Sequence, residues 1–100
     1  MKSIWKFPLE IADIQTIKVP KNSIFLCLKT QNDVPATYWE VNTNETLSYY
    51  YVFYIFGTGH PLENTQNLHY IDSVVCNDGN LVWHVYCKHD IKGIKIIKGL

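Results

Sequence analysis

The chain has 100 residues, 47% hydrophobic and 14% aromatic, with nine basic residues (all lysine), nine acidic residues and a formal net charge of zero. This composition predicts one folded domain rather than a disordered chain, and it lacks the basic excess of a protein that coats nucleic acid. Zero net charge also removes the repulsion that keeps copies apart, so it favours self-association.

Strands separated by turns about every ten residues predict an all-β fold. In the first half of the chain we expect strands at residues 3–9, 14–19, 24–30 and 37–41. Pro8 indicates an edge position for the first strand, because proline cannot donate to a ladder. Strict alternation in the third strand puts Ile24, Leu26 and Leu28 on one face and Phe25 and Cys27 on the other. A turn over residues 31–35 precedes the strand around Trp39.

Residues 47–56 form the most unusual predicted strand, because both of its faces are apolar. One face carries Tyr49, Tyr51, Phe53 and Ile55, and the other carries Tyr50, Val52, Tyr54 and Phe56. A strand with one face exposed to solvent alternates apolar and polar residues. This strand is therefore either central in a two-layer sandwich or covered on one face by another subunit. Tyrosine suits an interface, because its ring packs while its hydroxyl stays near water.

A long loop over residues 57–67 leads to a predicted hairpin with strands at 70–76 and 81–88. The Asp78-Gly79 pair between them tolerates the positive φ angles of a type I′ turn. Lysine and β-branched residues over 91–97 indicate either a last edge strand or a tail. The sequence thus predicts a compact antiparallel sandwich or partly closed barrel of six to eight short strands. We expect a single β domain over residues 1–100, with its core in 3–88 and a C-terminal tail or edge strand at 89–100.

The Gly57-Thr58-Gly59-His60 segment is the clearest candidate for ligand contact. Two glycines two positions apart let backbone amides approach an anion closely. Thr58 and His60 add hydrogen-bonding groups suited to a phosphate or a ribose. A Rossmann fingerprint would need a third glycine and a following helix, and a Walker pattern would need Gly-Lys-Ser/Thr. The alternative interpretation is a tight irregular turn without a ligand.

Patterns for catalysis, metals and membranes are weak. No strand-to-helix elbow presents a serine nucleophile, and a zinc site at His84, Cys87 and His89 fails because 84 and 87 face opposite sides of a strand. The number of cysteines is odd, and Cys27, Cys76 and Cys87 form no CxxC pair. Neither a signal peptide nor a run of about 20 apolar residues is present. We expect a binding protein rather than an enzyme, with reduced thiols, no metal, no cofactor and no membrane partner.

Several segments, in this order, resemble a family of small uncharacterised bacteriophage proteins. They are Ile4-Trp5-Lys6-Phe7-Pro8-Leu9, the Pro20-Lys21 turn, Trp39, Ile55-Phe56-Gly57-Thr58-Gly59-His60-Pro61, Tyr70-Ile71 and Leu81-Val82-Trp83-His84-Val85-Tyr86. The family's hallmarks are an I-Y-G-T-G-H-P loop and a closing strand resembling L-V-F-H-V-F. This chain departs by having Phe56 where tyrosine is usual and a tyrosine-rich strand where basic residues are usual. The resemblance implies a phage origin and action in the cytoplasm of the bacterial host, without an established activity.

The preferred hypothesis is a phage-encoded protein that counters bacterial defence by sequestering a nucleotide-type immune signal in a homo-oligomer. The signal would be a cyclic ADP-ribose-like molecule or a cyclic dinucleotide. Expected ligand-binding residues are Gly57, Thr58, Gly59 and His60 for phosphate or ribose, His84 in support, Tyr54 or Tyr86 for base stacking, and Lys21 as a charge partner. The alternatives are a protein inhibitor of a host factor that uses the tyrosine-rich face, a small nucleotide-signal hydrolase with His60 and His84 as acid and base, and a virion component.

Overall fold

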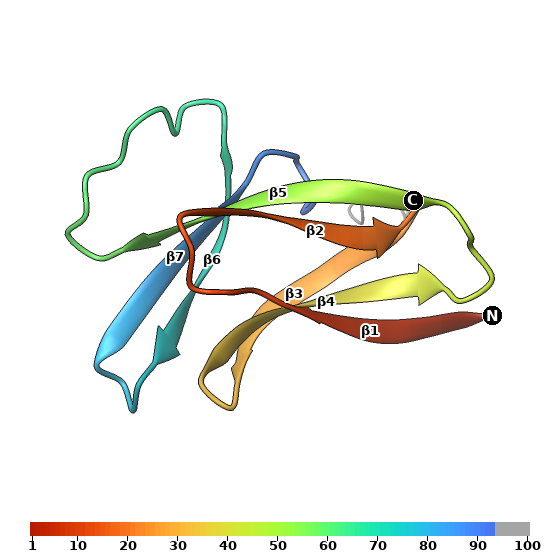
Figure 1. The fold of residues 1–100 in the computed structure, drawn as a ribbon, viewed down its shortest axis with the longest axis horizontal. Helices are drawn as coiled ribbons and strands as arrows, with labels where there is room; N and C mark the ends of the chain where they lie inside the picture. The colour runs from red at the N-terminus through yellow and green to blue at the C-terminus, as the bar shows by residue number, and fades with distance from the viewer. Residues whose placement is uncertain (94–100) are drawn as a thin grey trace.

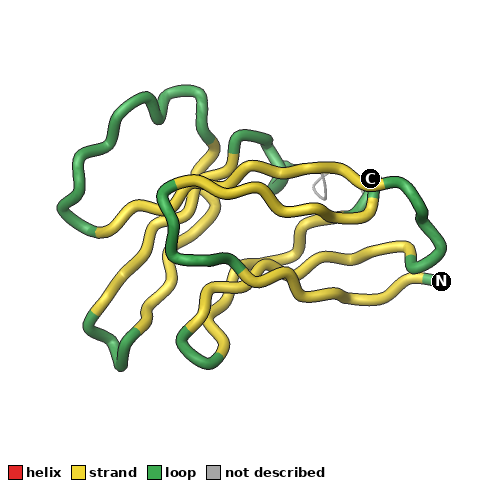
Figure 2. The backbone as a smooth tube through the Cα atoms, in the orientation of Figure 1, coloured by secondary structure: helices red, strands yellow, loops and turns green. Residues whose placement is uncertain are grey.

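The computed structural model describes residues 1–93, which form two stacked antiparallel β-sheets (Figures 1 and 2). The strands are β1 (Lys2–Pro8), β2 (Ile14–Pro20), β3 (Ile24–Gln31), β4 (Val34–Asn42), β5 (Ser48–Gly57), β6 (His69–Cys76) and β7 (Leu81–Cys87). One sheet has the order β1-β4-β3 and the other β2-β5-β7-β6. Of the two predicted architectures, a sandwich and a partly closed barrel, the structure therefore has the sandwich. No helix in this part of the chain is available to cross a membrane.

The core lies between the two sheets and is centred on Trp39 of β4, which is fully buried. Its indole ring lies 5.3 Å from the ring of Phe25 and 4.8 Å from that of Tyr51, so it joins the two layers. The indole Nε1 donates to Thr37 Oγ1 at 2.9 Å, and Thr37 donates to the Phe7 carbonyl at 2.8 Å. The polar groups that Trp39 and Thr37 bring into the core are thus paired, which avoids a desolvation cost.

Two β-bulges break the strict alternation that the sequence predicts. The register of β3 shifts between Phe25 and Cys27, so the extra residue is Leu26. The expectation that Phe25 and Leu28 face opposite sides is wrong, because both are buried in the core. An equivalent shift occurs in β6 between Tyr70 and Asp72. One extra residue in a strand reverses the facing of every residue beyond it.

The predicted turn chemistry is largely confirmed. Asp78 and Gly79 have φ angles of 54° and 89°, and the Asn80 amide donates to the Asn77 carbonyl at 3.0 Å, as a type I′ turn requires. The expected edge position of Pro8 is also confirmed, since β1 lies at the edge of its sheet. The turn expected over residues 31–35 is tighter than predicted, because Val34 and Pro35 already belong to β4.

Strand β5 is central in the four-stranded sheet, and its inward side chains Tyr51, Phe53 and Ile55 are buried. The outer surface of this sheet is rich in apolar side chains, with Thr16, Lys18, Ser73 and His84 among them, and residues 1–93 leave its apolar members exposed or half-buried. We call it the aromatic face; its members are Ile14, Tyr50, Val52, Tyr54, Phe56, Tyr70, Val75, Val82 and Tyr86. In Figure 1, β6 and β7 run steeply across the direction of β2 and β5, so the sheet is strongly twisted.

The core continues past β7, because Ile91 is fully buried within the same hydrophobic cluster. Of the possible last strand at 91–97, residues 91–93 are irregular and the remainder lie outside the described residues. The three cysteines are free thiols, with Cys76 and Cys87 buried. Burial raises the pKa of the Cys87 thiol to about 11, although amides of Lys88 and His89 partly offset the effect. Burial also raises the pKa of Tyr51.

Candidate ligand-binding pocket

The glycine-rich segment forms a tight turn at the end of β5. The His60 amide donates to the Gly57 carbonyl at 3.1 Å, and Gly59 has a φ of +88°, which suits the third position of a type II turn. A Cβ on Gly57 would lie 2.8 Å from Cε1 and 2.9 Å from Nδ1 of His60. The imidazole of His60 therefore packs directly on the backbone of Gly57. The turn thus does more than reverse the chain, because it holds the His60 ring against the end of the sheet.

His84 lies in the middle of the same sheet, where it pairs with Phe56 on one side and Ser73 on the other. Its Nε2 is 2.7 Å from Thr58 Oγ1, and its Nδ1 is 2.7 Å from Ser73 Oγ. The Ser73 hydroxyl is in turn hydrogen-bonded to the Tyr70 hydroxyl. A neutral imidazole donates from one nitrogen and accepts at the other. The four side chains therefore form one continuous hydrogen-bonded chain that holds the His84 ring in a fixed orientation.

The sequence alone does not identify Ser73 and Tyr70 as partners of His84. Strict alternation from Tyr70 would put Ser73 on the opposite face, and the bulge at Ile71 brings both residues onto the outer face. No residue pattern in a single strand marks such a bulge. The partnership depends on the pairing of β6 with β7, which the sequence does not state.

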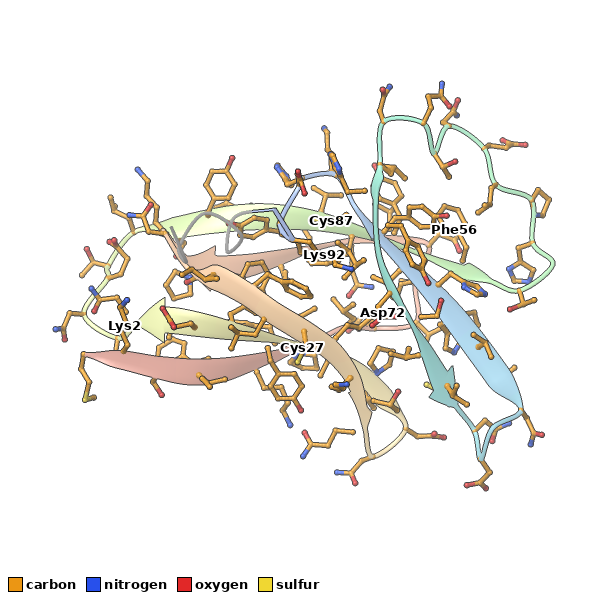
Figure 3. All side chains as sticks on the ribbon, turned by 180° about the vertical axis from the view of Figure 1, so that it is seen from behind. Lys2, Cys27, Phe56, Asp72, Cys87 and Lys92 are labelled. Atoms are coloured by element: carbon orange, nitrogen blue, oxygen red, sulfur yellow. The ribbon has the colours of Figure 1, made fainter. Side chains whose placement is uncertain are left out.

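The turn and the sheet enclose a pocket of about 220 Å³. Its lining residues are Phe56, Gly57, Thr58, Gly59, His60, Leu62, His84 and Tyr86. Six of them were expected from the sequence, whereas Phe56 and Leu62 were not. Phe56 and Tyr86 make an edge-to-face contact with ring centroids 5.5 Å apart, which gives the pocket an aromatic wall. Figure 3 shows Phe56 at the end of β5 beside the long loop.

A second hollow of about 550 Å³ lies on the other side of Phe56 and His60. Its lining residues are Asp13, Ile14, Tyr54, Ile55, Phe56, His60, Pro61, Glu63 and Asn64. Tyr54 therefore borders this hollow and not the smaller pocket. Sites for drug-sized ligands typically measure about 300–1,000 Å³. The larger hollow alone is within that range, and Phe56 and His60 lie on the boundary that it shares with the smaller pocket.

Comparison with protein-family models matches residues 1–93 to a domain of unknown function, DUF7352. The chain belongs to the DUF7352 family. Comparisons with curated proteins and with solved structures gave no significant match. The family match includes both hollows and the hydrogen-bonded chain around His84, but it assigns no activity to them.

In this DUF7352 chain, Lys21 is not brought to the pocket. It follows Pro20, which pairs with Ser48 at the start of β5, whereas the pocket lies at the end of β5 near Gly57. Nine strand residues separate the two ends, which corresponds to about 30 Å. Lys21 instead borders a separate hollow with Tyr49, Tyr51 and His89. The structure therefore assembles seven of the eight expected residues around two adjacent hollows and leaves Lys21 apart.

The lining of the smaller pocket includes no lysine, aspartate or glutamate. Its polar groups are the Thr58 hydroxyl, the imidazoles of His60 and His84, and the backbone of the turn. Within residues 1–93, no three histidine, cysteine or acidic side chains gather as a metal site would require. This lining is chemically suited to hydrogen-bond the oxygens of a ribose or a phosphate and to pack an aromatic ring.

Proposed function

We propose that this DUF7352 chain is a binding protein for a nucleotide-type ligand. The single observation that carries the proposal is the His84 ring, held between Thr58 and Ser73 at 2.7 Å on each side, next to the His60 turn. When Nε2 of His84 donates to Thr58, the Thr58 hydroxyl hydrogen is free to donate to a ligand oxygen. A phosphate or ribose oxygen in the smaller pocket would therefore be bound by Thr58 and His60.

Base stacking is assigned to Tyr54 rather than Tyr86. The ring of Tyr86 already has Phe56 at 5.5 Å and Tyr70 at 5.3 Å, both edge to face. Among the described residues no aromatic ring packs on Tyr54, which borders the larger hollow. Stacking of a base on an aromatic side chain contributes about 1–3 kcal/mol. The nucleotide would thus extend across Phe56 and His60, with its base at Tyr54 and its phosphate or ribose at Thr58.

The biological role rests on the resemblance to small phage proteins. The proposed role is that of a phage-encoded protein that counters bacterial defence in the host cytoplasm. It would sequester a cyclic ADP-ribose-like molecule or a cyclic dinucleotide without cleaving it. This role needs tight binding and slow release, which the preformed turn and the oriented His84 ring favour by reducing the ordering cost of binding.

A thermal-shift screen against cyclic dinucleotides and ADP-ribose derivatives tests the proposal. A ligand at a hundred times its Kd stabilises the folded state by about 2.7 kcal/mol, which moves the Tm visibly. His60→Ala should abolish most of the shift. His69→Ala is the matched control, since His69 is an exposed histidine at the start of β6. A panel without any shift, or full affinity in His60→Ala, contradicts the proposed site.

Hydrolysis of the same signal is a second candidate function. The 2.7 Å contact between Thr58 Oγ1 and His84 Nε2 is also the distance expected between a nucleophile and its general base. Recovery of the ligand after heat denaturation separates the two functions. Intact ligand supports sequestration, whereas ligand converted over time in wild type but not in His84→Phe supports hydrolysis.

A further inference from the structure

The aromatic face is a large apolar surface that residues 1–93 leave open. Its four most exposed members, Ile14, Tyr50, Tyr70 and Val75, are 55%, 57%, 49% and 54% exposed. A large side chain that is fully exposed presents about 200 Å², so these four alone present about 400 Å². The largest apolar patch on a typical monomer measures about 300–600 Å² and is often functional.

Charged side chains of opposite sign lie at the two ends of the part of this face that β2 and β5 form. Lys18 pairs with Tyr50, and the Lys88 amide donates to the Val52 carbonyl at 2.9 Å. Both lysines are therefore near the start of β5. At the other end, Asp13 and Glu63 border the hollow next to Tyr54. Four residues of β2 separate Lys18 from the Ile14 end, a distance of about 13 Å.

We propose that a second copy of this chain packs on the aromatic face with its strands running in the opposite direction. A two-fold dimer uses the same surface twice. Antiparallel stacking sets the Lys18–Lys88 end of each copy against the Asp13–Glu63 end of the other. The charge pattern is thus complementary to itself in this orientation, whereas parallel stacking would set like charges together.

Area, composition and net charge all support a second copy as the occupant. A standard interface buries about 800 Å² on each partner, and Ile14 and Tyr50 on β2 and β5 supply about a quarter of that before the partly exposed side chains of β5 are added. Tyrosine is enriched in interface cores. The net charge of zero means that two copies meet without long-range repulsion.

The dimer goes beyond the proposed nucleotide binding and does not rest on it. Its formation is measured on the purified protein without any ligand. Tyr54, Phe56 and Tyr86 belong both to the aromatic face and to the proposed ligand site, so a nucleotide that stacks on Tyr54 should compete with the second copy. Failure of the ligand screen would therefore leave the dimer proposal intact, and a monomeric protein would leave the nucleotide proposal intact.

Sedimentation equilibrium of the full chain tests the proposal. We expect twice the 11.7 kDa mass of one chain at micromolar concentration. Tyr50→Glu should raise the dimer dissociation constant about tenfold or more, because position 50 lies beside Lys18 and would face the acidic end of the second copy. Ile4→Glu is the matched control, since Ile4 is 64% exposed on β1 of the other sheet and should leave the dimer unchanged. A monomeric wild type, or a dimer that Tyr50→Glu leaves intact, overturns the proposal. Circular dichroism verifies that each variant folds.

A charge exchange tests the antiparallel orientation. Lys18→Glu sets like charges together across the interface and should weaken the dimer. Adding Glu63→Lys in the same chain restores opposite charges between the two copies, so the double variant should recover most of the lost affinity. Both effects should shrink at high salt. A double variant that is as weak as Lys18→Glu, or weaker, rules out this orientation.

Discussion

Substitution of the two turn glycines by alanine should have opposite consequences. Gly59 has a φ of +88°, and a Cβ added there would meet no heavy atom within 4 Å, so the cost of the substitution comes from the backbone alone. A left-handed conformation costs a non-glycine residue about 1–2 kcal/mol. In a domain of this size, that corresponds to a Tm lowered by about 4–16 °C. Gly59 lines the pocket, but the His60 ring keeps its place against Gly57 in this variant, so ligand affinity should fall less than in Gly57→Ala.

Gly57→Ala should instead affect binding and leave stability nearly unchanged. The new Cβ would lie 2.8 Å from the His60 ring, and the ring must move because this distance is too short for a contact between carbon atoms. His60 is an exposed side chain, so its displacement costs little free energy. The alanine also makes the unfolded chain less flexible, which stabilises the folded state by about 0.4–1 kcal/mol and offsets that cost. The imidazole would no longer border the pocket, and ligand affinity should fall as far as in His60→Ala.

Thermal denaturation followed by circular dichroism, together with titration calorimetry of any ligand found in the screen, measures both quantities. The His60 ring signals in an NMR spectrum report its displacement even without a ligand. Our reasoning is refuted if Gly57→Ala lowers the Tm as much as Gly59→Ala and leaves the His60 signals unchanged.

Three further predictions concern stability. The free energy of unfolding should fall as the pH rises from about 9 to about 11. Burial raises the pKa of Cys87 to about 11 and also raises that of Tyr51, so the folded state keeps these protons to higher pH than the unfolded state does. In urea denaturation, the Cys87→Val variant should show a smaller fall. A double-mutant cycle of Thr58→Val and His84→Phe should give a coupling of about 0.5–1.5 kcal/mol, and zero coupling would contradict their hydrogen bond. Trp39→Ala should cost about 3–5 kcal/mol, measured by chemical denaturation.

The local features of this fold are predictable from the sequence. Alternation and turn residues identify the seven strands to within a few residues, because strand periodicity and turn chemistry are properties of neighbouring residues. The Asp78-Gly79 turn and the edge position of Pro8 follow from the backbone preferences of glycine and proline. The candidate pocket is partly predictable for the same reason, since Gly57, Thr58, Gly59 and His60 are consecutive and form one turn.

Features that depend on pairing between strands are determined only by the tertiary structure. The bulges at Leu26 and Ile71 arise where one strand has one more residue than the strand with which it pairs. Each bulge reverses the facing of the residues beyond it. The partnership of Ser73 with His84 depends on one of these bulges, and the distance of Lys21 from the pocket depends on the register of β2 with β5. The sequence by itself determined that both faces of β5 are apolar; only the stacking of the two sheets decided that the Tyr51 side is buried and the Tyr50 side is open, because burial depends on which layer packs against which face.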